Sequence, residues 1–307
     1  MHYLVTGGCG FIGSHLVEHL LRGGHRVTVL DDLSTGKRDN IPTDTSLVTG
    51  DITTPGIFDP LVRHVDGCFH LAAIASVERS RNDWQRTHQV NLGGAIALFE
   101  AIARAKKPIP VVFASSAAVY GDCPDMPLTE ASACAPISAY GVDKLACEWH
   151  ARVASHLFHI PTLGLRFFNI YGPRQDPSSP YSGVISIFTA RMKQHAPVTI
   201  YGDGEQSRDF VFVGDVVKAL EAGMHQLHQG ALRYGVCNVC AGTSISINTL
   251  AQTLARLTDT RSAITHAPAR DGDIRQSLGD ASIAKRMLNV SPCIALEDGL
   301  RQTLESL

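Results

Sequence analysis

Short apolar runs alternate with amphipathic stretches over the first 170 residues of this 307-residue chain. The apolar runs have the length of buried strands, and they are 2–6, 26–30, 46–49, 67–71, 110–115 and 162–167. Helix-like spacing lies between them, most clearly over 91–107 and 138–158. This alternation predicts an α/β fold built on a doubly wound parallel sheet. Ligands of such a sheet bind beyond the carboxyl ends of the strands, so we expect functional residues to follow strands.

Three glycines stand between the first strand and the first helix. Gly7 would let the chain turn sharply, Gly10 would let the backbone approach a pyrophosphate, and Gly13 would let the helix pack closely on the sheet. The free amides at the start of the helix then favour bound phosphate. A structural turn without a ligand is the alternative. The second strand ends in Asp31, however, and an acid about 20 residues after such glycines suits the ribose hydroxyls of an adenosine.

Later strands are followed by further candidates for contact with a dinucleotide. Asp51 follows the third strand, where it would either accept a hydrogen bond from an adenine amino group or cap a turn. The fourth strand ends in His70-Leu71-Ala72-Ala73, whose small residues would let the backbone pass close to a flat ligand. Asn91 opens a helix, where it would either cap that helix or touch the cofactor.

Candidate catalytic groups follow the fifth strand, which ends in Ser115 and Ser116. Tyr140 and Lys144 are four residues apart in a helical pattern and therefore share one helix face. A phenol is a poor base at neutral pH, and a nearby ammonium favours its phenolate. Such a pair occurs by chance in many helices, but its combination with the glycine turn and Ser116 indicates catalysis.

Composition and charge set broad limits. The chain is 44% hydrophobic and 18% charged, with a net charge of −2, which is ordinary for a soluble protein and gives no sign of a nucleic-acid partner. No apolar run reaches the length of a membrane span. A strand that starts at residue 2 leaves no room for a signal peptide, so we expect a cytoplasmic protein.

Eight cysteines are scattered along the chain, and several lie inside apolar runs. Only Cys237 and Cys240 have the spacing of metal ligands, and a single pair in a strand-like run is weak support for zinc. We therefore expect reduced thiols and no metal site.

Together the motifs resemble those of the extended short-chain dehydrogenase/reductases, in the NAD-dependent sugar-nucleotide epimerase and dehydratase branch, and most of all those of UDP-hexose 4-epimerases. The motifs that carry this resemblance are 6–13, 70–73, 115–116, 140–144, 166–174, 207–216 and 238–242. The resemblance spans nearly the whole chain. It implies a Rossmann domain of residues 1–168 plus 211–240 and a smaller carboxyl-terminal α/β lobe, 169–210 plus 241–307, that grips the substrate.

The resemblance also implies bound NAD and assigns the catalytic roles. Tyr140 would be the base, Lys144 its electrostatic partner and a ribose ligand, and Ser116 a hydrogen-bond partner of the sugar O4. Asp31 favours NAD over NADP, because a carboxylate repels a 2′-phosphate. The residues expected to contact NAD are Gly7, Gly10, Phe11, Ile12, Gly13, Asp31, Asp51, Ile52, Leu71, Ala72, Ala73, Asn91, Ser115, Tyr140, Lys144 and Phe167.

A nucleoside diphosphate sugar is the substrate class that the resemblance implies. Asn169 would touch its phosphate region, Arg208 and Arg270 would pair with the diphosphate, and Asp273 would reach the uridine ribose. Taken alone, either arginine would read as an ordinary surface charge.

The reaction follows from what stands after Ser116. Related dehydratases carry an Asp-Glu pair there and related decarboxylases a Glu, whereas this chain has Ala117 and Ala118, which cannot transfer protons. This leaves 4-epimerisation of a UDP-sugar through a 4-keto intermediate.

Ser277 aligns with a position that is a bulky Tyr in epimerases that reject acetamido sugars, so UDP-GlcNAc/UDP-GalNAc is favoured, alone or beside UDP-Glc/UDP-Gal.

Several alternatives stay open. A UDP-uronic acid 4-epimerase fits if Arg79, Arg81 or Arg191 meets a carboxylate, and a reductase or a non-catalytic nucleotide-binding regulator would use the same fold. Ala75 stands where the glucose/galactose enzymes carry a lysine, so contacts to NAD must differ there. Helices 91–107 and 138–158 resemble those that pair across family dimers, which predicts a homodimer.

Overall fold

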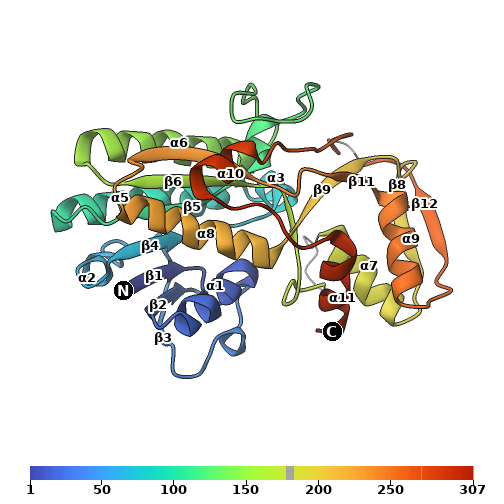
Figure 1. Ribbon diagram of the computed structural model, residues 1–307, viewed down its shortest axis with the longest axis horizontal. Coiled ribbons are helices and arrows are strands. Elements are labelled where there is room, and N and C mark those ends of the chain that lie inside the picture. Colours follow the sequence, from blue (N-terminus) through green and yellow to red (C-terminus); the bar gives the residue numbers. More distant parts are fainter. Residues whose placement is uncertain (178–182, 271, 307) are drawn as a thin grey trace.

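The computed structural model describes residues 1–177, 183–270 and 272–306. Its central feature is a seven-stranded parallel sheet (Figure 1). In spatial order the strands are β10 (Tyr234–Val239), β6 (Thr162–Phe167), β5 (Val111–Ser116), β4 (Gly67–His70), β1 (His2–Thr6), β2 (Arg26–Asp31) and β3 (Ser46–Thr49). The predicted doubly wound α/β fold is confirmed, and each strand-like run begins within one residue of an observed strand.

Helices cover both faces of this sheet. On one face lie α1 (Phe11–Arg22), α8 (Val213–His228) and α10 (Ser282–Leu288), and on the other α2 (Asp59–Val62), α5 (Gly94–Ala105) and α6 (Ala139–Phe158). Neighbouring strand residues point to opposite faces, so Val5 joins the first core and Leu4 the second. Burial on both faces explains why the central strands read as continuous apolar runs.

Short elements connect the strands at their carboxyl ends. They are η1 (Arg38–Asn40), α3 (Val77–Asn82), α4 (Trp84–His88), the π-helix η2 (Gln89–Gly93) and the 3-10 helix η3 (Ala117–Tyr120). The helix expected over 91–107 therefore begins inside η2 and continues as α5. The helix expected over 138–158 matches α6, whose first turn is capped by the Ser138 hydroxyl accepting from the Gly141 amide.

A smaller group of elements lies to the right of the main sheet in Figure 1. It contains a three-stranded sheet, β7 (Asn169–Tyr171), β9 (Ser207–Phe212) and β11 (Ser244–Ser246), and a pair, β8 (Val198–Tyr201) and β12 (Ile264–Ala267). Helices α7 (Val184–Lys193), α9 (Ile247–Leu257) and α11 (Leu296–Glu305) enclose a core that includes Phe188, Leu250 and Leu300. Helix α10 instead packs against α8 and β10, although it belongs to the segment 241–307.

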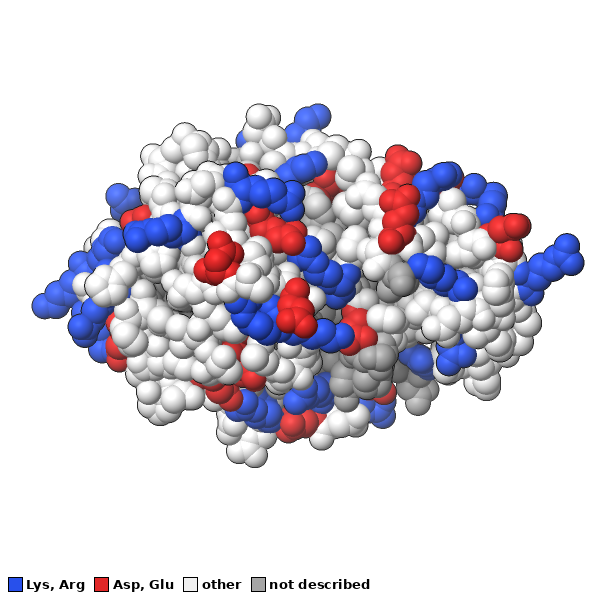
Figure 2. Space-filling model, turned by 90° about the horizontal axis from the view of Figure 1, so that it is seen from below, with Lys and Arg blue, Asp and Glu red and all other residues white. Residues whose placement is uncertain are grey.

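The surface agrees with the near-neutral composition. On the face shown in Figure 2, basic and acidic side chains are interspersed. Among the helices of the described residues, none has the length and apolar character that crossing a bilayer requires.

Candidate active site

A cleft of about 470 Å³ runs along the carboxyl ends of the central strands. Its lining includes all but one of the residues expected to contact a dinucleotide: Gly7, Gly10, Phe11, Ile12, Gly13, Asp31, Asp51, Ile52, Leu71, Ala72, Ala73, Ser115, Tyr140, Lys144 and Phe167. The exception is Asn91, which is buried outside the lining. Its side-chain oxygen accepts from the Ile74 amide at 2.8 Å, so Asn91 holds the chain that borders the cleft.

The glycine turn has the geometry that its sequence predicts. Gly7 has a φ of +69°, a left-handed conformation that costs glycine little. A Cβ at Gly7 would lie 2.8 Å from the Ala72 amide nitrogen, and one at Gly13 would lie 2.1 Å from the Gly7 carbonyl oxygen. The absence of side chains therefore lets β1, α1 and the chain after β4 meet closely, and helix α1 starts at the cleft with its first amides free.

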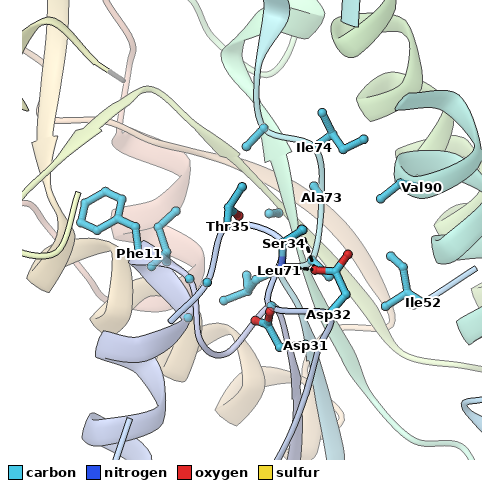
Figure 3. A pocket seen from close by; sticks show the side chains of 18 of the residues that line it. Phe11, Asp31, Asp32, Ser34, Thr35, Ile52, Leu71, Ala73, Ile74 and Val90 are labelled. Carbon is cyan, nitrogen blue, oxygen red and sulfur yellow. Dashed lines mark hydrogen bonds between the residues drawn. The ribbon is translucent and has the colours of Figure 1, made fainter. Parts of the chain in front are cut away.

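Asp31 ends β2 and points into the cleft, between Phe11 on one side and Ile52 and Val90 on the other (Figure 3). Its carboxylate accepts from the amides of Cys9 and Leu33, each at 2.9 Å. Burial raises the pKa of Asp31, and these two amide bonds act in the opposite direction. The two bonds fix the orientation of the carboxylate in the cleft lining.

Asp51 is held by neighbours that sequence patterns did not identify. Its carboxylate pairs with Arg86 and accepts from the amide of Thr53 at 2.8 Å. Burial acts to raise the pKa of Asp51, but the hydrogen bonds from Thr53 and Arg86 outweigh it and leave the pKa below its ordinary value. Asp51 is thus an anionic acceptor at the edge of the apolar wall formed by Ile52 and Val90.

Ser116, Tyr140 and Lys144 all line the same cleft, although two of them lie on α6 and one at the end of β5. The Lys144 ammonium is 5.7 Å from the centre of the Tyr140 ring and donates to the Ala114 carbonyl at 2.8 Å. The Ser116 hydroxyl accepts from the Ala118 amide at 3.1 Å, which leaves its own hydrogen available for a ligand. The structure thus places these three side chains in the lining of one cleft, as the sequence predicts.

Gly141 makes this approach of helix and strand end sterically feasible. A Cβ at Gly141 would lie 2.6 Å from the Ala118 carbonyl oxygen. Any larger residue would therefore push the start of α6, and Tyr140 with it, away from the segment that carries Ser116.

His70, at the end of β4, is a neutral neighbour of this group. Burial, with a smaller contribution from the Lys144 charge, lowers the pKa of His70 to about 3. Its Nδ1 lies 2.9 Å from the Thr6 hydroxyl oxygen. Lys144 therefore has a neutral imidazole beside it at the end of β4. It is 5% exposed and has no carboxylate partner among the described residues.

A second cleft of about 380 Å³ adjoins the first, because Ile170 and Gln175 line both. Four of the residues expected to bind substrate line it: Asn169, Arg208, Arg270 and Asp273. Arg208 pairs with Asp273, and burial lowers the pKa of Arg208 despite that partner. The Arg270 guanidinium lies 3.9 Å over the Tyr201 ring. Tyr201 is a lining residue that no local sequence signal marks.

Ser277 lies outside the lining of both clefts. Its amide donates to the Ser207 carbonyl at 3.1 Å, so its backbone runs alongside the residue that precedes Arg208.

The cysteine pair does not form a ligand set. Cys237 and Cys240 belong to different hydrophobic clusters. Within the described residues, no group of three or more His, Cys, Asp or Glu side chains is arranged to hold a metal ion.

Comparisons with known proteins agree with this geometry. A UDP-glucose 4-epimerase of Mycolicibacterium smegmatis is 35% identical over 312 residues, which cover 99% of this chain and 98% of that protein. The crystal structure of UDP-glucose 4-epimerase from Thermotoga maritima with UDP-glucose superposes with a TM-score of 0.94, at 34% identity and covering 100% of this chain and 98% of that one. UDP-N-acetylglucosamine 4-epimerase from Methanobrevibacter ruminantium, in complex with UDP-N-acetylmuramic acid, gives a TM-score of 0.93 at 34% identity, covering 99% and 97%.

The profile of one protein family matches most of the chain. Residues 3–240 match the NAD dependent epimerase/dehydratase family, and this range contains the glycine turn, Asp31, Ser116, Tyr140 and Lys144. The chain is therefore a member of the NAD-dependent epimerase/dehydratase family, within the extended short-chain dehydrogenase/reductases.

Proposed function

We propose that this protein is an isomerase that inverts C4 of a UDP-sugar with the help of bound NAD. The observation that carries the proposal is the meeting of Ser116, Tyr140 and Lys144 at one cleft, next to a second cleft with two guanidinium groups. The first set suits proton transfer beside a dinucleotide, and the second suits a diphosphate. The similarity to two 4-epimerases over nearly the full chain supports the same reaction.

The first cleft fits NAD. The glycine turn offers free amides at the start of α1 for the pyrophosphate, and the Asp31 carboxylate suits ribose hydroxyls. Apolar side chains of Ile52 and Val90 suit the faces of an adenine. A carboxylate at position 31 disfavours the extra phosphate of NADP. When bound, NAD would supply the redox chemistry, as the acceptor and then the donor of the C4 hydride.

Side chains of the protein would transfer the proton of the C4 hydroxyl. Tyr140 takes the proton of the C4 hydroxyl and later returns it, while the Lys144 ammonium stabilises the phenolate in a poorly solvated site. Ser116 donates its hydroxyl hydrogen to the sugar O4. Ala117 and Ala118 follow without a proton-transferring group, so the 4-keto sugar is not driven toward elimination.

The second cleft would hold the rest of the substrate. Arg208 and Arg270 offer guanidinium groups to the diphosphate, and Asn169 lines the same cleft next to Ile170, which both clefts share. Asp273, which now pairs with Arg208, would accept from a ribose hydroxyl. Tyr201 presents a ring that suits stacking against a uracil.

We propose acetamido sugars as substrates because Ser277 stands where the related epimerases that reject such sugars carry a bulky Tyr. Ser277 lines neither cleft, but its backbone contact with Ser207, next to Arg208, places it beside the second one. The matched test compares Ser277→Tyr with wild type on UDP-GlcNAc and UDP-Glc. Selective loss of UDP-GlcNAc turnover supports the assignment, and equal loss with both sugars contradicts it.

A UDP-uronic acid is a second candidate substrate, favoured by Arg79. Arg79 lines the first cleft and has no carboxylate partner among the described residues, whereas Arg191 on α7 donates to the Pro197 carbonyl. Incubation with UDP-GlcNAc, UDP-Glc and UDP-GlcA, followed by separation of the products, ranks these substrates. Absence of a 4-epimer from all three would overturn the proposed function.

A homodimer is supported by an apolar stripe on α6. Val142, Trp149, Val153 and Leu157 repeat at spacings that share one helix face, and all are exposed, Trp149 by 63%. Exposed apolar side chains of this size mark interaction surfaces, and we propose that a second copy covers them through 138–158 and 91–107. Sedimentation of wild type and Trp149→Glu tests this, with a monomeric variant expected.

The division into a Rossmann domain, 1–168 plus 211–240, and a substrate lobe, 169–210 plus 241–307, remains a proposal. The packing of α10 argues for moving residues 282–288 to the first domain.

The eight cysteines are free thiols, which supports the proposed cytoplasmic location.

A further inference from the structure

Glu148 and Arg166 form an ion pair inside the molecule, next to the proposed catalytic residues. Glu148 lies on α6 and is 2% exposed, and Arg166 lies on β6 and is 4% exposed. Two parallel hydrogen bonds join them, Nε to Oε1 at 2.9 Å and Nη2 to Oε2 at 2.7 Å. A buried pair of this kind seldom stabilises a fold more than apolar side chains of similar volume. Its hydrogen bonds to neighbouring segments point to a contribution to geometry instead.

On one side the pair holds the residue that precedes Ser116. The Ser115 hydroxyl donates to Glu148 Oε1 at 2.5 Å and is itself buried. One turn earlier on α6, Lys144 donates to the carbonyl of Ala114. Helix α6 is therefore bonded to two successive residues of β5.

On the other side the pair holds the end of the segment that follows Ser116. Arg166 Nη1 donates to the Tyr120 hydroxyl oxygen at 3.0 Å, and this hydroxyl donates to Asn238 Oδ1 at 2.6 Å. Tyr120 is the last residue of η3, which Ser116 caps. Both flanks of Ser116 are thus tied to one carboxylate–guanidinium unit.

The same unit fixes the helix that carries the other two groups. Tyr140, Lys144 and Glu148 are spaced four residues apart on α6, so they form one row along a single helix face. Any shift of Glu148 relative to Ser115 would move Tyr140 relative to Ser116 as well.

We infer that Glu148 and Arg166 are positioning residues that hold Ser116 and Tyr140 at the separation that proton transfer requires. This inference rests on the proposed function. Neither side chain lines the cleft, so the pair acts through Ser115, Tyr120 and the helix rather than by touching substrate.

The test replaces both partners at once, as Glu148→Leu/Arg166→Met. This double variant leaves no buried charge without a partner and keeps the net charge, so the field at Tyr140 changes little. We expect kcat to fall by roughly tenfold or more, because small misplacements of reacting groups are costly. KM should stay within about threefold and NAD content should stay at the wild-type level, since neither cleft loses a side chain.

The matched control removes an exposed pair, Glu297→Leu/Arg256→Met, which joins α11 to α9 far from α6. Its kcat should equal that of wild type. A kcat of the Glu148/Arg166 variant within twofold of wild type would overturn the inference, as would a fall of the same size in the control.

Two single variants carry the test if the double variant does not fold. Ser115→Ala and Tyr120→Phe each remove one of the two flanking bonds without touching a charge. Each should lower kcat by a smaller factor at unchanged KM and unchanged NAD content; the NAD content separates the lost hydrogen bond from a lost contact between Ser115 and NAD. Wild-type kcat in both would count against the inference.

Hydrogen exchange separates this inference from the proposed function. If wild type converts no UDP-sugar, the proposed function fails, but the positioning role can still be read from the amides of residues 115–120. Exchange of that segment should rise selectively in the double variant. Unchanged exchange there, or an equal rise throughout the protein, would contradict a positioning role.

Discussion

The two clefts are built in different ways, although they adjoin. The first is shaped by backbone and small side chains at strand ends, with glycines at the closest contacts. The second is lined by longer side chains from β7, β8, β9 and the chain after β12, such as Tyr201, Arg208 and Arg270. A cofactor that is reused in each turnover can be bound by fixed backbone amides, whereas a substrate that enters and leaves needs charged side chains that can exchange partners.

The Arg208–Asp273 pair is an example of charged side chains that line the second cleft, and both side chains are partly accessible. Asp31 in the first cleft is instead fixed by two backbone amides. We therefore expect changes in the first cleft to affect assembly of the holoenzyme, and changes in the second to affect KM.

The largest expected effect comes from replacing Tyr140, the proposed base, which lines the first cleft. Tyr140→Phe removes the oxygen that we propose transfers the proton, so kcat should fall by roughly 10²–10⁴-fold, as for loss of a general acid–base group. The cleft is otherwise intact, so NAD released on denaturation should match wild type. Turnover near the wild-type rate would rule out Tyr140 as the base.

Glycine substitutions should break the first cleft in two distinguishable ways. Gly13→Ala places a Cβ 2.1 Å from the Gly7 carbonyl oxygen, and an overlap of this size should destabilise the fold by about 1–3 kcal/mol and release NAD. At Gly10 the nearest atom would be 3.2 Å away, so Gly10→Ala should retain stability and weaken NAD binding alone. Thermal melts and NAD content measure both; equal melting temperatures for the two variants would contradict the steric account.

Changes in the second cleft, which we propose binds the substrate, should alter KM. Arg270→Met removes one charged hydrogen-bonding group, commonly about 1.5–3 kcal/mol, so KM for the UDP-sugar should rise by roughly 10–100-fold at nearly constant kcat. Arg275→Met is the control, because Arg275 pairs with Asp203 on the surface of the same lobe and lines neither cleft. A comparable rise in the control would show that lobe stability, not the diphosphate contact, sets KM.

The pH dependence of stability should depend on His70. His70 is held neutral, with its pKa lowered to about 3 mainly by burial, so the unfolded chain binds a proton between about pH 6.5 and 3 that the folded chain does not. Stability should therefore fall on acidification below about pH 6.5, by up to roughly 1.4 kcal/mol per pH unit. In the variant His70→Asn this contribution should disappear from melts recorded between pH 7 and 4.

Asp209, on β9, should have the opposite effect on the pH dependence of stability. Burial raises its pKa to about 6, against the effect of three backbone amides that donate to it from Ala241, Gly242 and Gly279. Between about pH 3.8 and 6 the folded chain holds a proton that the unfolded chain releases. The contribution of Asp209 to the stability of the fold is therefore lost as pH rises through that window. Asp209→Asn should therefore steepen the acid-side loss, and a flatter profile would contradict the assignment.

Local sequence determined the sheet and most of the first cleft. Strand periodicity, the glycine spacing and Asp31 are short-range features, because each describes a few residues whose conformation follows from their own φ/ψ freedom and burial. The row Tyr140–Lys144 is likewise set by the helix repeat alone. These features could be predicted because no distant partner had to be known.

Tertiary structure alone decided which distant side chains became partners. Arg86 meets Asp51, Arg270 meets Tyr201, and Ser277 falls outside both clefts, none of which has a local signal. Asn91 was predicted as a cap or a cofactor contact, yet it bonds the backbone of Ile74. Long side chains choose partners according to which segments the packed core brings within reach, and that choice depends on contacts between residues far apart in the chain rather than on the period of any one element.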